Sequence, residues 1–156
     1  MVVALALTLI QTRTIEVRIF VLEDCPIARQ YAPEIKRLQA TFQPKGVRFT
    51  LVHVDPHTTD ASAKRFAKAF GFTFGYLLDP KHKLAKAAGV QAVPTASVHA
   101  NGKLTYVGRI DNRYPELGVL KKPTRADLRI AIEEILAGKP ITEAKTKVIG
   151  CVLPTL

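Results

Sequence analysis

The two cysteines are the residues of this chain best suited to covalent chemistry, because a thiolate is both a nucleophile and a redox centre. Cys25 follows an apolar run and precedes Pro26, which suits the first helical position because no backbone N–H is needed there. Free N–H groups at a helix start favour a thiolate. The neighbouring carboxylates of Glu23 and Asp24 disfavour one, so the net effect on Cys25 stays open. A buried structural cysteine is the other interpretation.

Metal chemistry is not indicated by the residue spacing. The chain has no Cys-x-x-Cys pair, which argues against a zinc site built from its own thiolates. The histidines also lack metal-ligand spacing: His53, His57, His82 and His99. His53 and His57 are four residues apart, but Pro56 between them prevents a shared helix face. The sequence therefore predicts no metal site and no cofactor.

Length and charge set limits on the remaining classes of function. The 156 residues correspond to a single domain with a sizeable core. The net charge of +10 is compatible with nucleic acid, an anionic membrane surface or an acidic partner. The basic residues are scattered, however, and no nucleic-acid-binding motif is present, so we predict no nucleic-acid partner. No run of about 18 apolar residues occurs, and no membrane span is expected.

Two apolar runs predict the central strands. Residues 15–22 and 47–54 each read as a strand buried on both faces, as in a parallel sheet. Between them, apolar residues at helical spacing predict a helix from Pro26 to Phe42. Pro33 lies inside this helix and should kink it.

The second half of the chain predicts shorter elements. A helix capped by Asp60 or Ser62 runs to about residue 70. Further elements follow in order: an extended segment 76–79, a short helix 81–88 opened by Pro80, a strand 95–100, an Asn101-Gly102 hairpin turn, a returning strand 104–110, an irregular loop 111–123, and a helix capped by Thr124 and ended by Gly138.

This order of elements predicts an α/β fold with a mixed sheet covered by helices on both faces. The predicted domain spans residues 1–138, and residues 139–156 form a tail that carries Cys151 and shows no clear element. Residues 1–12 are an apolar segment, and two interpretations stay open: a signal remnant or an extra element of the fold.

The chain resembles the thioredoxin superfamily. A proline eight residues after the first active-site cysteine is typical of that family, and Cys25 and Pro33 stand in this relation. The segment Gly89-Val90-Gln91-Ala92-Val93-Pro94-Thr95 is similar to the family's loop with a cis proline. The resemblance implies a thioredoxin-like three-layer sandwich. It also implies that Val93, Pro94 and Thr95 bind substrate beside Cys25, whereas an ordinary strand-start proline is the alternative for Pro94.

Within the superfamily, the chain is most similar to a bacterial redoxin group described as alkyl hydroperoxide reductase/thiol-specific antioxidant-like. Four stretches carry this resemblance: Asp24-Cys25-Pro26-Ile27, Tyr31-Ala32-Pro33-Glu34, Gly108-Arg109-Ile110-Asp111 with Tyr114, and Gly150-Cys151. It implies supporting roles for Pro26, Arg109, Asp111 and Tyr114. With Arg113, the last three form a polar cluster after a strand, and three interpretations of this cluster stay open: a solvated loop with a local ion pair, an anchor for the tail, or a site for a substrate carboxylate. The resemblance favours a role in cell redox homeostasis and a periplasmic or extracytoplasmic location, with a cytoplasmic one as the alternative.

Three departures from the superfamily restrict the chemistry. Ala28 replaces the second cysteine of Cys-x-x-Cys, so Cys25 has no local resolving partner. Arg18 and Leu22 stand where peroxiredoxins have their proline and threonine, which argues against an efficient peroxidase. Arg29 stands where copper chaperones of this fold have a second cysteine, which argues against a copper site.

Cys151 decides between the remaining hypotheses. We expect a thiol-disulfide oxidoreductase acting on protein thiols or disulfides, with Cys25 as nucleophile and Cys151 as the resolving cysteine if the tail folds back. There are three alternatives: a non-catalytic partner-binding module with a structural Cys25–Cys151 disulfide, a free thiol at Cys151, or a one-cysteine thiol peroxidase. The sequence favours an enzyme and does not predict an oligomeric state.

Overall fold

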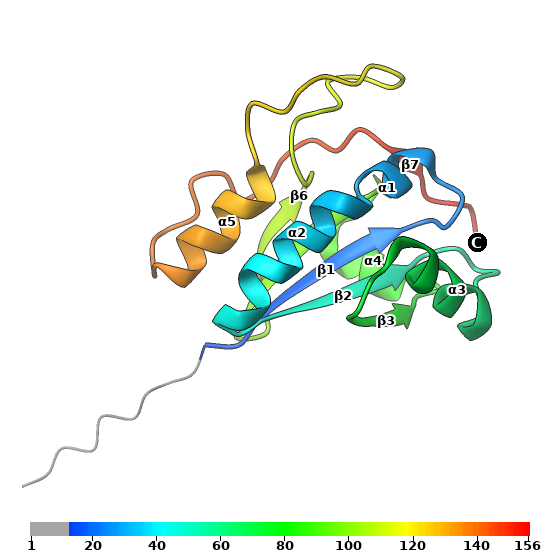
Figure 1. Cartoon of the computed structure of the whole chain (residues 1–156), viewed down its shortest axis with the longest axis horizontal. Coiled ribbons are helices and arrows are strands. Elements are labelled where there is room, and N and C mark those ends of the chain that lie inside the picture. Colours follow the sequence, from blue (N-terminus) through cyan, green and yellow to red (C-terminus); the bar gives the residue numbers. More distant parts are fainter. Residues whose placement is uncertain (1–12) are drawn as a thin grey trace, which may run out of the picture.

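A mixed five-stranded sheet forms the centre of the molecule. The structure is a computed structural model that describes residues 13–156, so the prediction made for residues 1–12 lies outside the described residues. The strand order is β3-β2-β1-β5-β6, with helices on both faces of the sheet (Figure 1). The predicted α/β architecture is confirmed. The strands are β1 (Ile15–Val21), β2 (Val47–His53), β3 (Gly75–Leu78), β5 (Thr95–Ala100) and β6 (Lys103–Gly108).

In the part of the chain that the structure describes, five α-helices accompany this sheet: α1 (Pro26–Gln30), α2 (Ala32–Phe42), α3 (Asp60–Phe70), α4 (Lys83–Ala88) and α5 (Asp127–Leu136). In Figure 1, α2 and α5 lie on the near face of the sheet, and α4 lies behind it. Among residues 13–156, no helix has the length and apolarity that crossing a membrane requires.

Strand β1 organises the sheet from its centre. It pairs parallel with β2 and antiparallel with β5, and Phe20 lies opposite Thr95 in the second pairing. Val17, Ile19 and Phe20 are fully buried, which explains the apolar run in the sequence. Because β1 and β5 run in opposite directions, the end of β1 and the start of β5 lie at the same edge of the sheet.

The predicted kink at Pro33 is a complete break between two helices. Helix α1 ends at Gln30, and Tyr31 separates it from α2, in whose first turn Pro33 lies. Pro33 has no N–H to donate to the carbonyl of Arg29, so an uninterrupted helix would lose a hydrogen bond there. The break places Tyr31 in the protein interior, where it is 3% exposed.

The cap of α3 differs from the prediction. Thr59, rather than Asp60 or Ser62, is the N-cap residue. The Thr59 hydroxyl accepts a hydrogen bond from the Ser62 N–H (3.2 Å), and the Ser62 hydroxyl accepts one from the Thr59 N–H (3.1 Å). In this reciprocal capping box Ser62 occupies the third helical position, so it supports the cap without being the N-cap residue.

Two further helix starts were wrongly predicted. Helix α4 begins at Lys83 rather than beside Pro80, and the carboxylate of Asp79 accepts a hydrogen bond from the Ala85 N–H (2.9 Å). Helix α5 begins at Asp127, and Thr124 does not cap it. The Thr124 hydroxyl instead accepts a hydrogen bond from the Asn112 side chain (2.8 Å) within the preceding loop.

The tail also contains an element that the sequence did not predict. Strand β7 (Cys151–Val152) pairs with β4 (Ala92–Val93) in a second, two-stranded sheet. In Figure 1 the red C-terminal segment runs beneath the yellow loop at the top of the view and reaches β7, beside α1. Residues 139–156 are therefore part of the folded structure.

His53 is the buried titratable residue at the end of β2. It is 1% exposed and lies between the rings of Phe66 and Tyr76, at centroid distances of 5.6 and 5.8 Å. Burial lowers the pKa of His53 to about 4, because the charged imidazolium loses its hydration. Its Nδ1 lies 3.3 Å from Glu23 Oε1, but at this pKa the contact involves a neutral imidazole at neutral pH.

This burial predicts a specific pH dependence of stability. Between the ordinary pKa of 6.5 and the lowered pKa of about 4, the unfolded chain binds more protons than the folded chain. The free energy of unfolding therefore falls as the pH drops through this range. We expect the free energy of unfolding of wild type, minus that of His53→Gln, to decrease by about 2 kcal/mol between about pH 7.5 and about pH 5.

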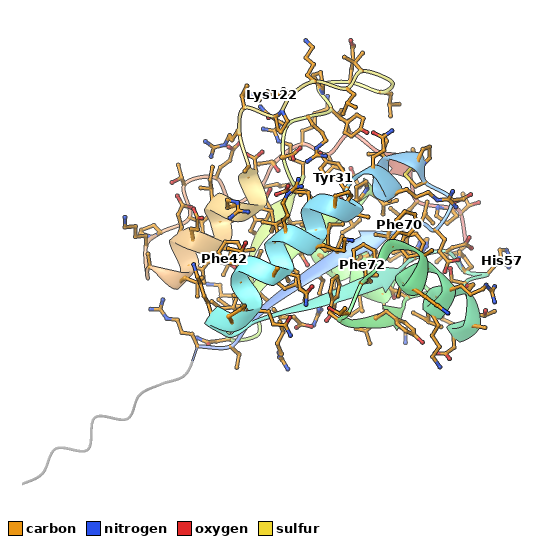
Figure 2. All side chains as sticks on the ribbon, viewed as in Figure 1. Tyr31, Phe42, His57, Phe70, Phe72 and Lys122 are labelled. Carbon is orange, nitrogen blue, oxygen red and sulfur yellow. A yellow bond between two sulfur atoms is a disulfide. The ribbon has the colours of Figure 1, made fainter. Side chains whose placement is uncertain are left out.

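Urea unfolding at the two pH values measures this change, with His57→Gln as control. His57 is exposed and lies at the periphery of the molecule (Figure 2). Parallel pH profiles for wild type and His53→Gln would show that His53 is not buried as described.

Candidate functional site

Cys25 lies at the junction between β1 and α1. It is the N-cap residue of α1, with extended backbone angles (φ −69°, ψ 114°), and Pro26 follows at the first helical position. Its N–H donates to the carbonyl of Leu22 (3.2 Å), which closes the turn after β1. Cys25 is only 2% exposed. Ala28, at the position of the missing second cysteine, is also buried in the core.

The Val93-Pro94 loop faces Cys25. The peptide bond between Val93 and Pro94 is cis, and Thr95 begins β5 directly after it. The sulfur of Cys25 lies 3.7 Å from the carbonyl oxygen of Val93. The Thr95 hydroxyl donates to the carbonyl of Ala92 (2.6 Å), which holds the loop in a tight turn. The β1–β5 pairing thus brings together residues that are 68 positions apart.

Cys151 is covalently bound to Cys25. The two residues form a disulfide with a Cα–Cα distance of 6.2 Å, within the range that a bridge needs. The tail reaches this position as β7, in which Cys151 pairs with Val93 and Val152 pairs with Ala92 in antiparallel register. The Leu153 N–H also donates to the carbonyl of Gln91 (3.4 Å). The tail therefore covers both Cys25 and the edge of the cis-proline loop.

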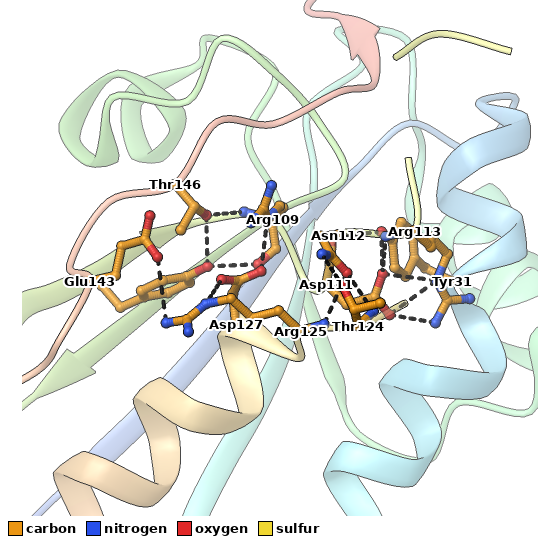
Figure 3. Close-up of polar contacts among 11 residues, drawn as sticks. Tyr31, Arg109, Asp111, Asn112, Arg113, Thr124, Arg125, Asp127, Glu143 and Thr146 are labelled. Carbon is orange, nitrogen blue, oxygen red and sulfur yellow. Dashed lines mark hydrogen bonds and ion pairs between the residues drawn. The ribbon is translucent and has the colours of Figure 1, made fainter. Parts of the chain in front are cut away.

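A second anchor holds the tail on β6. The Val107 N–H donates to the carbonyl of Ala144 (3.0 Å), and the Thr146 N–H donates to the carbonyl of Val107 (3.2 Å). The Thr146 hydroxyl accepts from the Arg109 N–H (2.9 Å) and shares a hydrogen bond with the Tyr106 hydroxyl (2.9 Å). Figure 3 shows Thr146 beside Arg109, with Tyr31 in a separate group of contacts.

Gly108 makes this second anchor sterically feasible. A Cβ atom at Gly108 would lie 2.0 Å from Thr146 Oγ1 and 2.9 Å from the Thr146 nitrogen. Sequence reasoning identified Gly108 within the Gly-Arg-Ile-Asp stretch but missed Thr146. No sequence signal distinguishes Thr146 from the other threonines of the tail.

Arg109 does not bind the tail through its side chain. Its guanidinium donates to the carboxylate of Asp127 (2.7 Å), which also accepts from Arg125 (2.7 Å). The Asp127 side chain is 1% exposed, so two cations compensate one buried charge. Arg125 further contacts Glu143 of the tail (3.4 Å). This network fixes the start of α5 to the end of β6 (Figure 3).

Asp111 and Tyr114 belong to a separate cluster around Tyr31. The Tyr31 hydroxyl donates to Asp111 Oδ1 (2.9 Å), and Arg113 forms an ion pair with the same carboxylate (2.6 Å). The Arg113 guanidinium lies 4.4 Å from the centre of the Tyr31 ring, and the Tyr114 hydroxyl contacts Gln30. Burial, assisted by Asp111, raises the pKa of Tyr31 well above its ordinary value.

The predicted site residues thus divide into two groups. The structure brings together Cys25, Cys151, Val93, Pro94 and Thr95 at one edge of the sheet. Arg109, Asp111 and Tyr114 fix the loop and helix elements next to that edge, through contacts with Asp127, Tyr31 and Gln30. The second group holds the α1–α2 junction and joins the end of β6 to α5.

This arrangement supports thiol-disulfide exchange in chemical terms. Cys25 and Cys151 can interconvert between a dithiol and a disulfide, and each conversion transfers two electrons. The edge of β4 presents backbone groups of the kind that bind an extended chain segment.

Comparisons with known proteins identify the family and the fold. The model of the AhpC/TSA family matches residues 11–107. No curated protein sequence matches the chain significantly. Among solved structures, an uncharacterized conserved protein from Geobacillus kaustophilus is 27% identical, with a TM-score of 0.78, over 92% of this chain and 78% of that chain. A hypothetical protein from Sinorhizobium meliloti 1021 is 25% identical, with a TM-score of 0.76, over 90% and 79%.

A more distant likeness concerns the fold alone. A secreted Mycobacterium tuberculosis disulfide oxidoreductase homologous to E. coli DsbE is 15% identical, with a TM-score of 0.54, over 80% of this chain and 81% of that chain. The fold is therefore thioredoxin-like, as the sequence predicted.

The position of the disulfide predicts a large contribution to stability. The bridge joins residues 126 positions apart, so reducing it releases a long loop in the unfolded chain. We expect reduction, or Cys151→Ser, to lower the free energy of unfolding by about 2–5 kcal/mol. Guanidinium unfolding with and without reductant measures this change, and reductant should leave the Cys151→Ser profile unchanged. Two titratable thiols in the unreduced, denatured wild type would contradict the bridge.

Proposed function

The chain belongs to the AhpC/TSA family, and from this premise we propose that it is a thiol-disulfide oxidoreductase with Cys25 as nucleophile and Cys151 as resolving cysteine. One observation carries the proposal. The disulfide between Cys25 and Cys151 lies at the start of α1, directly against the Val93-Pro94 loop. A bridge needed only for stability could join any two elements, whereas this one involves the residue that a thioredoxin-like fold uses for exchange.

The proposed reaction takes place in two displacements. The Cys25 thiolate attacks one sulfur of a substrate disulfide, which forms a mixed disulfide and releases the first substrate thiolate. The Cys151 thiolate then attacks Cys25 Sγ, which forms the intramolecular bridge and releases the second thiolate. The substrate gains two electrons and the protein becomes oxidised. A dithiol reductant restores both cysteines, and the reverse sequence oxidises a substrate dithiol.

Val93, Pro94 and Thr95 bind the substrate in this proposal. Val93 lies opposite Cys151 in the β4–β7 pairing, so its backbone groups are suited to an extended chain carrying a cysteine. The substrates are accordingly protein thiols or disulfides. Sulfur carries both electrons, so the exchange needs no cofactor.

We further propose an extracytoplasmic location. The mycobacterial structural neighbour is a secreted disulfide oxidoreductase. In addition, the only two cysteines of the chain are paired with each other, and such bridges persist in oxidising compartments.

A partner-binding module stapled by the same disulfide is the second candidate. The low exposure of Cys25, 2%, favours it, because a nucleophile has to reach its substrate. Substituting each cysteine separately distinguishes the two functions.

Under the oxidoreductase proposal, the two cysteine variants have different activities. In insulin reduction with a dithiol donor, wild type turns over and Cys25→Ser falls to the uncatalysed rate, because the attacking thiolate is lost. Cys151→Ser, reduced and freed of the dithiol before insulin is added, performs the first displacement only and accumulates a mixed disulfide on Cys25, visible by intact mass. If wild type and Cys25→Ser reduce insulin at the same rate, Cys25 is a structural cysteine. Hydrogen peroxide as oxidant serves as the control for peroxidase activity.

A further inference from the structure

The tail shows how the edge of β4 holds a cysteine-bearing segment. Residues 151–152 lie extended against residues 92–93, with Cys151 opposite Val93, and Leu153 continues the pairing to Gln91. This is the geometry by which an exposed strand edge adds a peptide strand. A substrate cysteine that reaches Cys25 along the same edge occupies the place of Cys151.

The position before the cysteine is closed to side chains. A Cβ atom at Gly150 would lie 2.0 Å from the carbonyl oxygen of Val93, 2.7 Å from the Val93 carbonyl carbon and 3.4 Å from the Pro94 nitrogen. The first two distances are far below a van der Waals contact, and all three atoms belong to the backbone of the Val93–Pro94 peptide. That peptide is fixed by Thr95 and by β5, so it cannot move aside as a flexible side chain would.

The position after the cysteine is open by comparison. Val152 is 78% exposed, so most of its side chain contacts solvent rather than the loop. The edge of β4 therefore restricts one neighbour of the cysteine and tolerates variation at the other.

We propose that this edge selects substrates in which glycine immediately precedes the reactive cysteine, so that the tail of the chain is a built-in copy of its own substrate. This inference rests on the oxidoreductase function proposed above. The proposed substrate class is an extended polypeptide segment that contains a Gly-Cys dipeptide. The Val93 carbonyl excludes other residues from the position before the cysteine.

A consequence is that tail and substrate exclude each other. Cys25 is covered while β7 is in place, so residues 150–152 leave β4 before a substrate disulfide is attacked. The anchor at Thr146 lies four residues earlier and does not need to open. Between the two anchors, a cavity of about 480 Å³ separates residues 145–148 from the loop at residues 89–92. When Cys151 returns to attack Cys25 Sγ, Gly150 regains its position and displaces the substrate segment.

Peptide disulfides test the selection directly on the full-length, reduced Cys151→Ser protein. The probes have the sequence of residues 149–153, with the cysteine activated by 5-thio-2-nitrobenzoate and preceded by glycine, alanine or valine. We expect the glycine peptide to react at least about tenfold faster than the alanine peptide. Replacing the residue after the cysteine by alanine should change the rate less than about twofold. Each rate is divided by that of the same peptide with glutathione, which removes differences in intrinsic reactivity.

The outcomes separate this inference from the proposed function. If glycine and alanine peptides react equally and both exceed the glutathione rate, Cys25 is a competent nucleophile and the proposed selection is wrong. If no peptide reacts faster with the protein than with glutathione, the oxidoreductase function is wrong and the selection fails with it.

A second measurement examines the same steric contact within the chain. In Gly150→Ala, the tail collides with the Val93 carbonyl, so the Cys25–Cys151 bridge should form less favourably in a glutathione redox buffer. We expect its equilibrium constant to fall at least about tenfold relative to wild type. Val152→Ala, on the same strand but exposed, is the matched control and should stay within about twofold. Equal constants for the two variants would overturn the inference.

Discussion

The antiparallel pairing of β1 with β5 is the constraint on which the site depends. It places Phe20 opposite Thr95, and therefore sets the turn that carries Cys25 beside the loop that ends in Pro94. The register is held by side chains such as Val17 and Ile19, which are completely buried. A slip of one residue would move these side chains to the half-buried positions of Glu16 and Arg18 and would bury those charged side chains in the core. Core packing thus fixes the position of the reactive sulfur.

The C-terminal tail is attached to this sheet at β6 and to the Val93-Pro94 loop at β4. Its two anchors share one physical device, a glycine that lets two backbones approach closely. Gly108 gives room to Thr146, and Gly150 gives room beside Val93. Residues 146–151 follow a defined course, because hydrogen bonds attach one end to β6 and the disulfide attaches the other end to Cys25. Along this course the tail is bonded to Cys25 and pairs with Val93, and Cys25 is 2% exposed.

Local patterns in the sequence were sufficient for most of the scaffold. The apolar runs of β1 and β2 were predictable because each depends on neighbouring residues. Pro33 predicted a kink for the same reason, although the structure has two separate helices, and the loop before β5 was expected from the family resemblance. The cap of α3 was not, because Thr59, Asp60 and Ser62 are all good capping residues and only the backbone geometry selects Thr59. Strand β7 was missed because two residues carry no periodicity and its partner lies far away in sequence. The resemblance led us to expect Cys25 beside the loop of Val93 and Pro94, but left the partner of Cys151 open. The exclusion of side chains at residue 150 depends on a contact with Val93 that exists only in three dimensions.

The contact of the tail with β6 has a consequence for association between copies of the chain. Strand β6 is an outer strand of the sheet, and unpaired outer strands readily add strands from other molecules. The hydrogen bonds from residues 144–146 to Val107 occupy part of that edge. In the proposed mechanism only residues 150–152 leave β4, so the hydrogen bonds of residues 144–146 would still cover this part of β6 when Cys25 meets its substrate. A protein working in this way would open its site without presenting a free outer strand to other copies of the chain.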